Sequence, residues 1–110
     1  MKLLITLIIA LLVVALPNRL RAADGKALWD ANCAQCHGKE GNADTKMGKT
    51  LGAKDLTSAQ VQGSFTDAQA ATAIKEGVKE NGKTKMKAFG DKLSADDVKA
   101  LVAYVRTLKK

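Results

Sequence analysis

The residues whose chemistry stands out are two cysteines and one histidine within five positions, Cys33-Ala34-Gln35-Cys36-His37. The chain has no other cysteine or histidine. One helical turn lets both sulfurs reach the two vinyl groups of one haem as thioethers, while the adjacent imidazole turns a ring nitrogen towards the iron. This spacing is the attachment pattern of covalent c-type haem. We therefore predict that Cys33 and Cys36 bind one haem c and that His37 is an iron ligand.

Three other chemistries use the same residue types. A redox dithiol of the thioredoxin kind is expected in a βαβ context, and no strand-like alternating run flanks this motif. A structural zinc site needs four ligands, of which these residues supply three. A plain disulfide suits an exported protein but leaves the histidine without a role. Covalent haem is favoured, and the redox dithiol is the main alternative.

The start of the chain has the layout of a secretory signal, with Lys2 followed by an aliphatic run from Leu3 to Leu16. As a helix this run would rise about 21 Å, which is short of the roughly 30 Å of a bilayer core. We expect cleavage after Ala22, which divides the chain into a signal peptide (1–22) and one mature domain (23–110). This predicts a periplasmic protein without a permanent membrane span, and an uncleaved anchor is the alternative.

The expected mature domain is small, and a chain of that size often needs a cofactor or staple to be stable. It keeps 15 of the 18 basic residues against 11 acidic ones, a formal net charge of +4. This charge is too small to indicate nucleic-acid binding, and no basic platform interleaved with aromatic residues is present. We expect a monomer.

The attachment motif must be positioned by the elements around it. The pattern predicts a helix over Asp24–Cys36, capped by Asp24, in which Gly25 allows a close approach. Its apolar face is expected to include Ala27, Leu28, Trp29, Ala31 and Ala34. Four glycines then predict a loop from Gly38 to Thr57 that wraps a haem edge, with Met47 and Leu51 lining that edge or filling the core.

The second half of the chain predicts a short helical turn over Ser58–Gln62 and a helix from the Thr66-Asp67-Ala68-Gln69 capping box to Glu76. Gly77 suits the left-handed helix end, and Val78–Leu93 is expected to be irregular. A last helix begins at Ser94 and carries an apolar stripe of Val98, Leu101, Val102, Val105 and Leu108. We expect this stripe to pack against the first helix, with Tyr104 or Leu101 approaching Gly25.

Three features together resemble the class I c-type cytochromes: CAQCHG, the KMKAF segment, and G-x-x-L-W in the first helix paired with L-x-x-Y in the last. The resemblance implies an all-α cytochrome c fold, with three to four short helices around one covalent haem and the N- and C-terminal helices packed together. It implies His37 as the proximal iron ligand and Met86 as the distal one.

One position departs from the family pattern. Family members often carry a proline in the loop after the motif, whose carbonyl accepts the second N–H of the proximal histidine, and Lys49 stands at that place. A backbone carbonyl does not require proline, so the hydrogen bond remains open to Lys49, but the loop loses rigidity.

These residues indicate a monohaem one-electron carrier and not an enzyme, because two filled axial positions leave the iron no place for substrate. The alternative is a haem peroxidase or gas-binding protein, which needs an open sixth position, and both Met86 and the lack of a second histidine argue against it. Between residues 75 and 92 six lysines stand against three acidic residues. We therefore expect an acidic redox protein to dock at Lys83, Lys85 and Lys87.

Overall fold

The structure is a computed structural model that describes residues 22–110, so residues 1–21 of the predicted signal peptide lie outside the described residues. The described residues form six helices and one antiparallel pair of strands, in agreement with the predicted all-α class. None of these helices is long and apolar enough to cross a membrane. In chain order the elements are α1 (Ala22–Asn32), α2 (Ala34–His37), α3 (Lys46–Leu51), α4 (Ala59–Gln62), α5 (Asp67–Glu76), β1 (Val78–Glu80), β2 (Lys83–Met86) and α6 (Ala95–Thr107).

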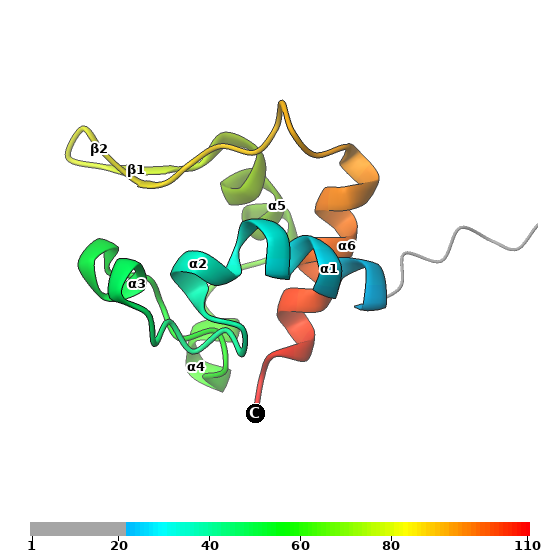
Figure 1. Cartoon of the computed structure of the whole chain (residues 1–110), viewed down its shortest axis with the longest axis horizontal. Coiled ribbons are helices and arrows are strands. Elements are labelled where there is room, and N and C mark those ends of the chain that lie inside the picture. Colours follow the sequence, from blue (N-terminus) through cyan, green and yellow to red (C-terminus); the bar gives the residue numbers. More distant parts are fainter. Residues whose placement is uncertain (1–21) are drawn as a thin grey trace, which may run out of the picture.

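The core forms where α1 crosses α6, as the sequence predicted (Figure 1). Gly25 makes the crossing close: a Cβ atom there would lie 2.4 Å from the carbonyl oxygen of Ala100 and 2.7 Å from the Cβ of Tyr104. Trp29 of α1 and Leu101 of α6 are among the most deeply buried side chains. The first and last helices of the described residues are therefore packed directly on each other, and the predicted attachment motif follows α1.

The predicted capping box at Thr66 and the predicted helix start at Ser94 are confirmed. The side chains of Thr66 and Gln69 form a reciprocal capping box at α5, and Ser94 and Asp97 form another at α6. Ser58 caps α4. In each case the cap side chain accepts a hydrogen bond from the amide three residues later, so the start of the helix depends on residues that are close together in the sequence.

The predicted single helix over Asp24–Cys36 is wrong in three details. Asp24 lies in the first turn of α1 and is not its cap, and the helix is interrupted at Cys33 before α2 begins. The apolar face also differs, because Ala27 and Ala31 are exposed. Packing against α6 selects the face that carries Gly25, Trp29 and Cys33 at intervals of four residues.

Two segments predicted to be irregular contain regular elements. The loop expected over Gly38–Thr57 includes α3, which Thr45 caps by accepting a hydrogen bond from the amide of Gly48. The segment Val78–Leu93 includes the β1–β2 hairpin, whose turn uses Asn81 and Gly82, both with positive φ. Such short elements are stabilised mainly by contacts with the rest of the fold, so their own sequence pattern is weak.

Candidate functional site

The predicted attachment motif forms one hydrogen-bonded helical turn. The amide of Cys33 donates to the carbonyl of Trp29 at 2.8 Å, which continues the ladder of α1. The carbonyl of Cys33 then accepts hydrogen bonds from the amides of Cys36 at 3.2 Å and His37 at 3.0 Å. The backbone thus brings the two cysteines and the histidine onto a single turn, as the spacing predicted.

The two cysteines lie in different surroundings. Cys33 is buried and Cys36 is half-buried, and neither is in a disulfide bond. Burial raises the pKa of the Cys33 thiol to about 11, with a smaller contribution from the neighbouring Cys36. Among residues 22–110 no group of three or more His, Cys, Asp or Glu side chains gathers to hold a metal ion. This arrangement gives no support to the alternative of a structural zinc site.

The ring of His37 is held by an aromatic contact. Its centroid lies 5.5 Å from that of Trp29, with the two ring planes tilted by 39°. Burial lowers the pKa of His37 from its ordinary value of 6.5, which favours the neutral imidazole that binds iron. Nδ1 of the ring is buried and has no hydrogen-bond partner among the described residues.

The bond from His37 to the carbonyl of Lys49, which the sequence left open, is therefore not formed in this structure. The Lys49 carbonyl instead accepts a hydrogen bond from the amide of Gly52, at the end of α3. The Lys49 side chain points outward and pairs with Asp44 at 3.0 Å.

Trp29 connects the attachment turn to the helix crossing. Its indole Nε1 donates to the carbonyl of Gly38 at 2.9 Å, directly after the motif. On its other side the ring lies 5.7 Å from that of Tyr104 in α6. Trp29 therefore contacts both α6, through Tyr104, and the residue that follows His37, through the Gly38 carbonyl.

Met86 is the last residue of β2 and is half-buried. It pairs with Val78 of β1, and its carbonyl lies so close to Gly77 that a Cβ atom there would be 2.5 Å away. Gly77 has a φ of +75° but an extended ψ of −177°, so it is not the left-handed helix end that was predicted. The conformation instead turns the chain from α5 directly into the hairpin.

The chain after Met86 is fastened to the end of α5. The amide of Phe89 donates to the carbonyl of Ile74 at 2.9 Å, and the amide of Gly90 donates to that of Lys75 at 3.1 Å. The buried Phe89 side chain belongs to the core. Met86 therefore lies in a strand that is held near α5 in two ways. Its partner strand β1 directly follows α5, and the residues after Met86 form hydrogen bonds with the end of α5.

The other methionine of the described residues, Met47, lies in α3 and is 44% exposed. α3 packs beside α2, whereas the hairpin that carries Met86 lies apart from both of them (Figure 1). Met47 and His37 thus belong to neighbouring elements, and Met86 comes from a different part of the molecule.

Two residues that hold the attachment turn were not identified from the sequence. The hydroxyl of Thr45 donates to the carbonyl of Cys36 at 2.6 Å, and Gly48 lies so close to the same carbonyl that a Cβ atom would be 2.3 Å from it. A threonine directly before a helical turn is an N-cap signal, and Thr45 is the residue before α3. Nothing in the sequence indicates that Cys36 is the partner.

The residues present fit a covalently bound haem. Two free thiols share one turn with an imidazole whose pKa is lowered by burial, and Nδ1 of that ring has no hydrogen-bond partner in the described part of the chain. A thioether is available from Met86. Imidazole and thioether are among the axial ligands that proteins offer to haem iron, so this donor set suits a six-coordinate haem.

Residues 20–105 match the protein family described as cytochrome C oxidase, cbb3-type, subunit III. The chain is 41% identical to cytochrome c6 of Cladophora glomerata over 83 residues, which are 76% of this chain and 84% of that protein. It is 36% identical to cytochrome c-553 of Helicobacter pylori (strain ATCC 700392 / 26695), and this match covers 93% of this chain and 96% of the relative. A solved structure named KustC0563 c-type cytochrome is similar with a TM-score of 0.71 and 39% identity, over 79% of this chain and 99% of that one.

Proposed function

The chain belongs to the cytochrome c family, and on this premise we propose that it is an exported monohaem electron carrier whose iron is ligated by His37 and Met86. Family membership confirms haem c as the covalently bound cofactor, and the similar solved structure confirms the predicted cytochrome c fold. A protein that keeps both cysteines as a free redox dithiol is therefore no longer a competing interpretation.

The observation that carries the proposal is the attachment turn. Cys33 and Cys36 lie on one helical turn with the half-buried His37, whose pKa is lowered by burial and whose Nδ1 has no hydrogen-bond partner among residues 22–110. Cys33 and Cys36 would hold the macrocycle as thioethers, and His37 would bind the iron from the same side as this turn. Met86, presented by the hairpin, would bind from the other side.

The chain's own residues would then control access to the metal. Bound haem supplies a one-electron couple, and a histidine and methionine pair raises its potential. With Met86 in the second axial position no site remains for a substrate, which supports electron transfer over peroxidase or gas-binding activity. Burial by the helices and the hairpin would limit contact with water, a further influence on the potential.

The ligand assignment is tested with Met86→Ala and the matched variant Met47→Ala, both expressed with haem-attachment machinery. Wild-type protein should give a c-type pyridine haemochrome, a low-spin spectrum, and an intact mass for a chain from Ala23 plus one haem. Met86→Ala should open the sixth position, lower the potential and admit carbon monoxide to the ferrous iron. Met47→Ala should change none of these, because its side chain is exposed on α3.

Other outcomes would separate the parts of the proposal. An unchanged spectrum in Met86→Ala with a loss in Met47→Ala would reverse the assignment. Carbon monoxide binding by the wild type would favour the gas-binding alternative. A full-length species retained in the membrane would contradict signal cleavage.

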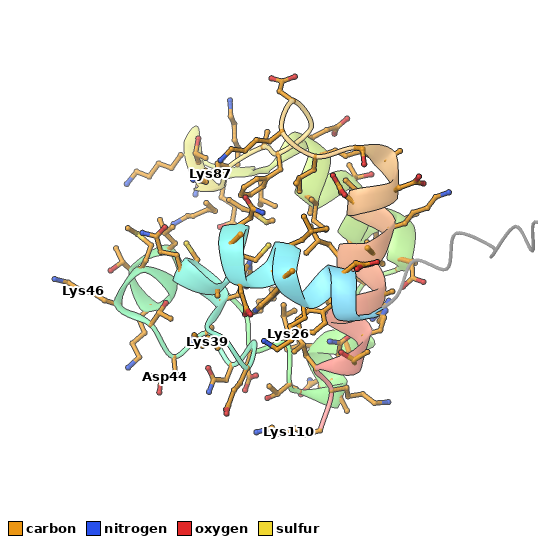
Figure 2. The ribbon with its side chains drawn as sticks, turned by 45° about the vertical axis from the view of Figure 1, so that its right-hand side comes forward. Lys26, Lys39, Asp44, Lys46, Lys87 and Lys110 are labelled. Atoms are coloured by element: carbon orange, nitrogen blue, oxygen red, sulfur yellow. The ribbon has the colours of Figure 1, made fainter. Side chains whose placement is uncertain are left out.

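The partner is proposed to be an acidic redox protein that meets the hairpin at Lys83, Lys85 and Lys87. None of these three lysines forms an ion pair within the described part of the chain. Alternate residues of a strand point to opposite faces, so Lys83 and Lys85 face away from Met86. The exposed Lys83, the half-buried Lys85 and the exposed Lys87, which directly follows β2 and is labelled in Figure 2, would therefore give this side of the hairpin a positive charge.

Charge reversal tests this docking surface. Changing Lys83, Lys85 and Lys87 to Glu should slow electron exchange with an acidic partner at low salt and leave the haem spectrum intact. Added salt should slow the wild-type reaction in the same way. A matched control changes Lys99, Lys109 and Lys110 to Glu, which alters the net charge equally at sites on and after α6. Equal rates for the two triple variants would reject the hairpin as the docking surface.

A further inference from the structure

The carbonyl groups at the end of the attachment turn are each held by a different part of the chain. Carbonyls in the last turn of a helix have no partner within the helix. Here Cys36 accepts from the hydroxyl of Thr45 at 2.6 Å, and His37 accepts from the amide of Ala43 at 2.8 Å. Gly38 accepts from the indole of Trp29 at 2.9 Å. The backbone on both sides of His37 is thus fixed, although no described residue forms a hydrogen bond with its ring nitrogen Nδ1.

The hydroxyl of Thr45 joins two elements at once. It accepts a hydrogen bond from the amide of Gly48 at 2.8 Å, which caps α3, and it donates to the carbonyl of Cys36 at the end of α2. A hydroxyl has one hydrogen to donate and two lone pairs, so both bonds form together. The start of α3 is in this way tied to the peptide group that joins Cys36 to His37.

The packing around this bond leaves little freedom. A Cβ atom on Gly48 would lie 2.3 Å from the Cys36 carbonyl and 2.9 Å from the Ala43 carbonyl, so α3 approaches through its glycine. The opposite side of this segment is in solvent, where Asp44 and Lys46 project away from the ribbon (Figure 2). The contact between α3 and the Cys36 carbonyl is therefore made by Gly48 and by the Thr45 cap.

We propose that Thr45 is a positioning residue for His37: by fixing the Cys36 carbonyl it sets the direction in which the imidazole meets the haem iron. This inference rests on the proposed role of His37 as an axial ligand. A ligating histidine is usually oriented by a hydrogen bond to its second ring nitrogen. Residues 22–110 supply no such bond to Nδ1, so we infer that the orientation is set through the backbone, with Thr45 on one side of His37 and the Trp29 ring against the imidazole.

The test compares holoprotein variants that differ in this hydroxyl. Thr45→Val keeps the shape of the side chain and removes both hydrogen bonds, whereas Thr45→Ser keeps the hydroxyl. Thr50→Val is the control within α3, because its exposed hydroxyl donates only to the carbonyl of Lys46. Ser58→Ala is the control for loss of a helix cap, because the Ser58 hydroxyl caps α4 by accepting a hydrogen bond from the amide of Val61.

The expected result is a changed midpoint potential and shifted proton NMR signals of the His37 ring in Thr45→Val. Thr45→Ser should restore both, and the two controls should match the wild type. Hydrogen exchange at the Gly48 amide should become faster by on the order of tenfold in Thr45→Val, the effect of losing one hydrogen bond.

Two results would overturn the inference. One is a Thr45→Val protein whose potential and His37 signals equal those of the wild type. The other is a wild-type holoprotein in which the Gly48 amide exchanges as fast as an exposed loop amide, and this measurement decides the matter if Thr45→Val yields no holoprotein. Failure of the ligand assignment itself is seen separately, as a wild-type protein without low-spin, His37-ligated haem.

Discussion

Replacing Gly25 with alanine should test the α1–α6 crossing on which the site depends. A Cβ atom at this position would lie 2.4 Å from the Ala100 carbonyl oxygen and 2.7 Å from the Tyr104 Cβ, and ordinary contact begins at about 3.4 Å. The two helices would have to separate by about 1 Å, because neither of these atoms can move without the backbone of α6.

The change in the free energy of unfolding on Gly25→Ala is the sum of two opposing effects. Overpacking a well-filled core costs about 1 to 3 kcal/mol, and the cost lies at the upper end where backbone atoms are met. Alanine in a helix gains about 1 kcal/mol over glycine. Separation of α1 from α6 also loosens contacts of Trp29 and Leu101, which are 2% and 0% exposed. We expect Gly25→Ala to lower the free energy of unfolding by about 2 kcal/mol.

The assay is equilibrium unfolding of the holoprotein in urea, followed by the fluorescence of Trp29, the single tryptophan of the chain. Gly63→Ala is the matched control. A Cβ atom on Gly63 would have its nearest neighbour at 3.5 Å, and its φ of −77° is accessible to alanine. The control should stay within about 0.5 kcal/mol of the wild type. Equal stability of the two variants would show that the close approach of α1 and α6 does not limit packing.

Two further predictions concern stability. Arg106→Leu should cost about 2 to 4 kcal/mol, because the guanidinium donates to the carbonyls of Gln62 at 2.6 Å and Phe65 at 2.8 Å, and to the side-chain oxygen of the buried Gln62 at 2.9 Å. The same urea assay should show no change for Lys26→Met, whose partner Asp30 lies in an exposed i,i+4 pair, and an equally small effect of Arg106→Leu would contradict the argument. The holoprotein should also lose stability as the pH falls below about 6.5, by at most about 1.4 kcal/mol per pH unit. The His37 ring released in the unfolded chain takes up a proton at its ordinary pKa of 6.5, whereas iron binding, on the proposed assignment, and burial, which lowers its pKa, keep it unprotonated in the folded chain. Urea midpoints that stay constant from about pH 7.5 to about pH 5 would refute this, since the lowered pKa of Asp55, caused by hydrogen bonds from Thr57, affects stability only at more acidic pH.

Several features of the site could be predicted from the sequence because they depend on neighbours a few residues away. The spacing of Cys33, Cys36 and His37 determines that they share one turn, whatever surrounds them. The predicted capping box at Thr66 closes over three residues, the last helix begins after Ser94 as predicted, and its apolar stripe follows the helical period. The resemblance to the cytochromes rests on these local patterns and on their order along the chain.

The tertiary structure decided the features that join distant residues. Which face of α1 is buried was set by α6, so Ala27 and Ala31 are exposed and Gly25 is buried. The segment after the hairpin that carries Met86 forms hydrogen bonds with carbonyls at the end of α5. These carbonyls lie outside residues 78–93, so the pattern of that segment does not indicate them.

The attachment turn shows the same division. Its cysteines and histidine are recognised from five consecutive residues. The groups that hydrogen-bond to it are the hydroxyl of Thr45, nine residues after Cys36, and the indole of Trp29, nine residues before Gly38. A sequence pattern records which hydrogen-bonding groups a chain has, and a buried carbonyl takes whichever donor the folded chain brings within reach. The iron ligands could therefore be proposed from the sequence, whereas the contact of Thr45 with the Cys36 carbonyl, from which we propose its role, depends on the packing of α3 against α2.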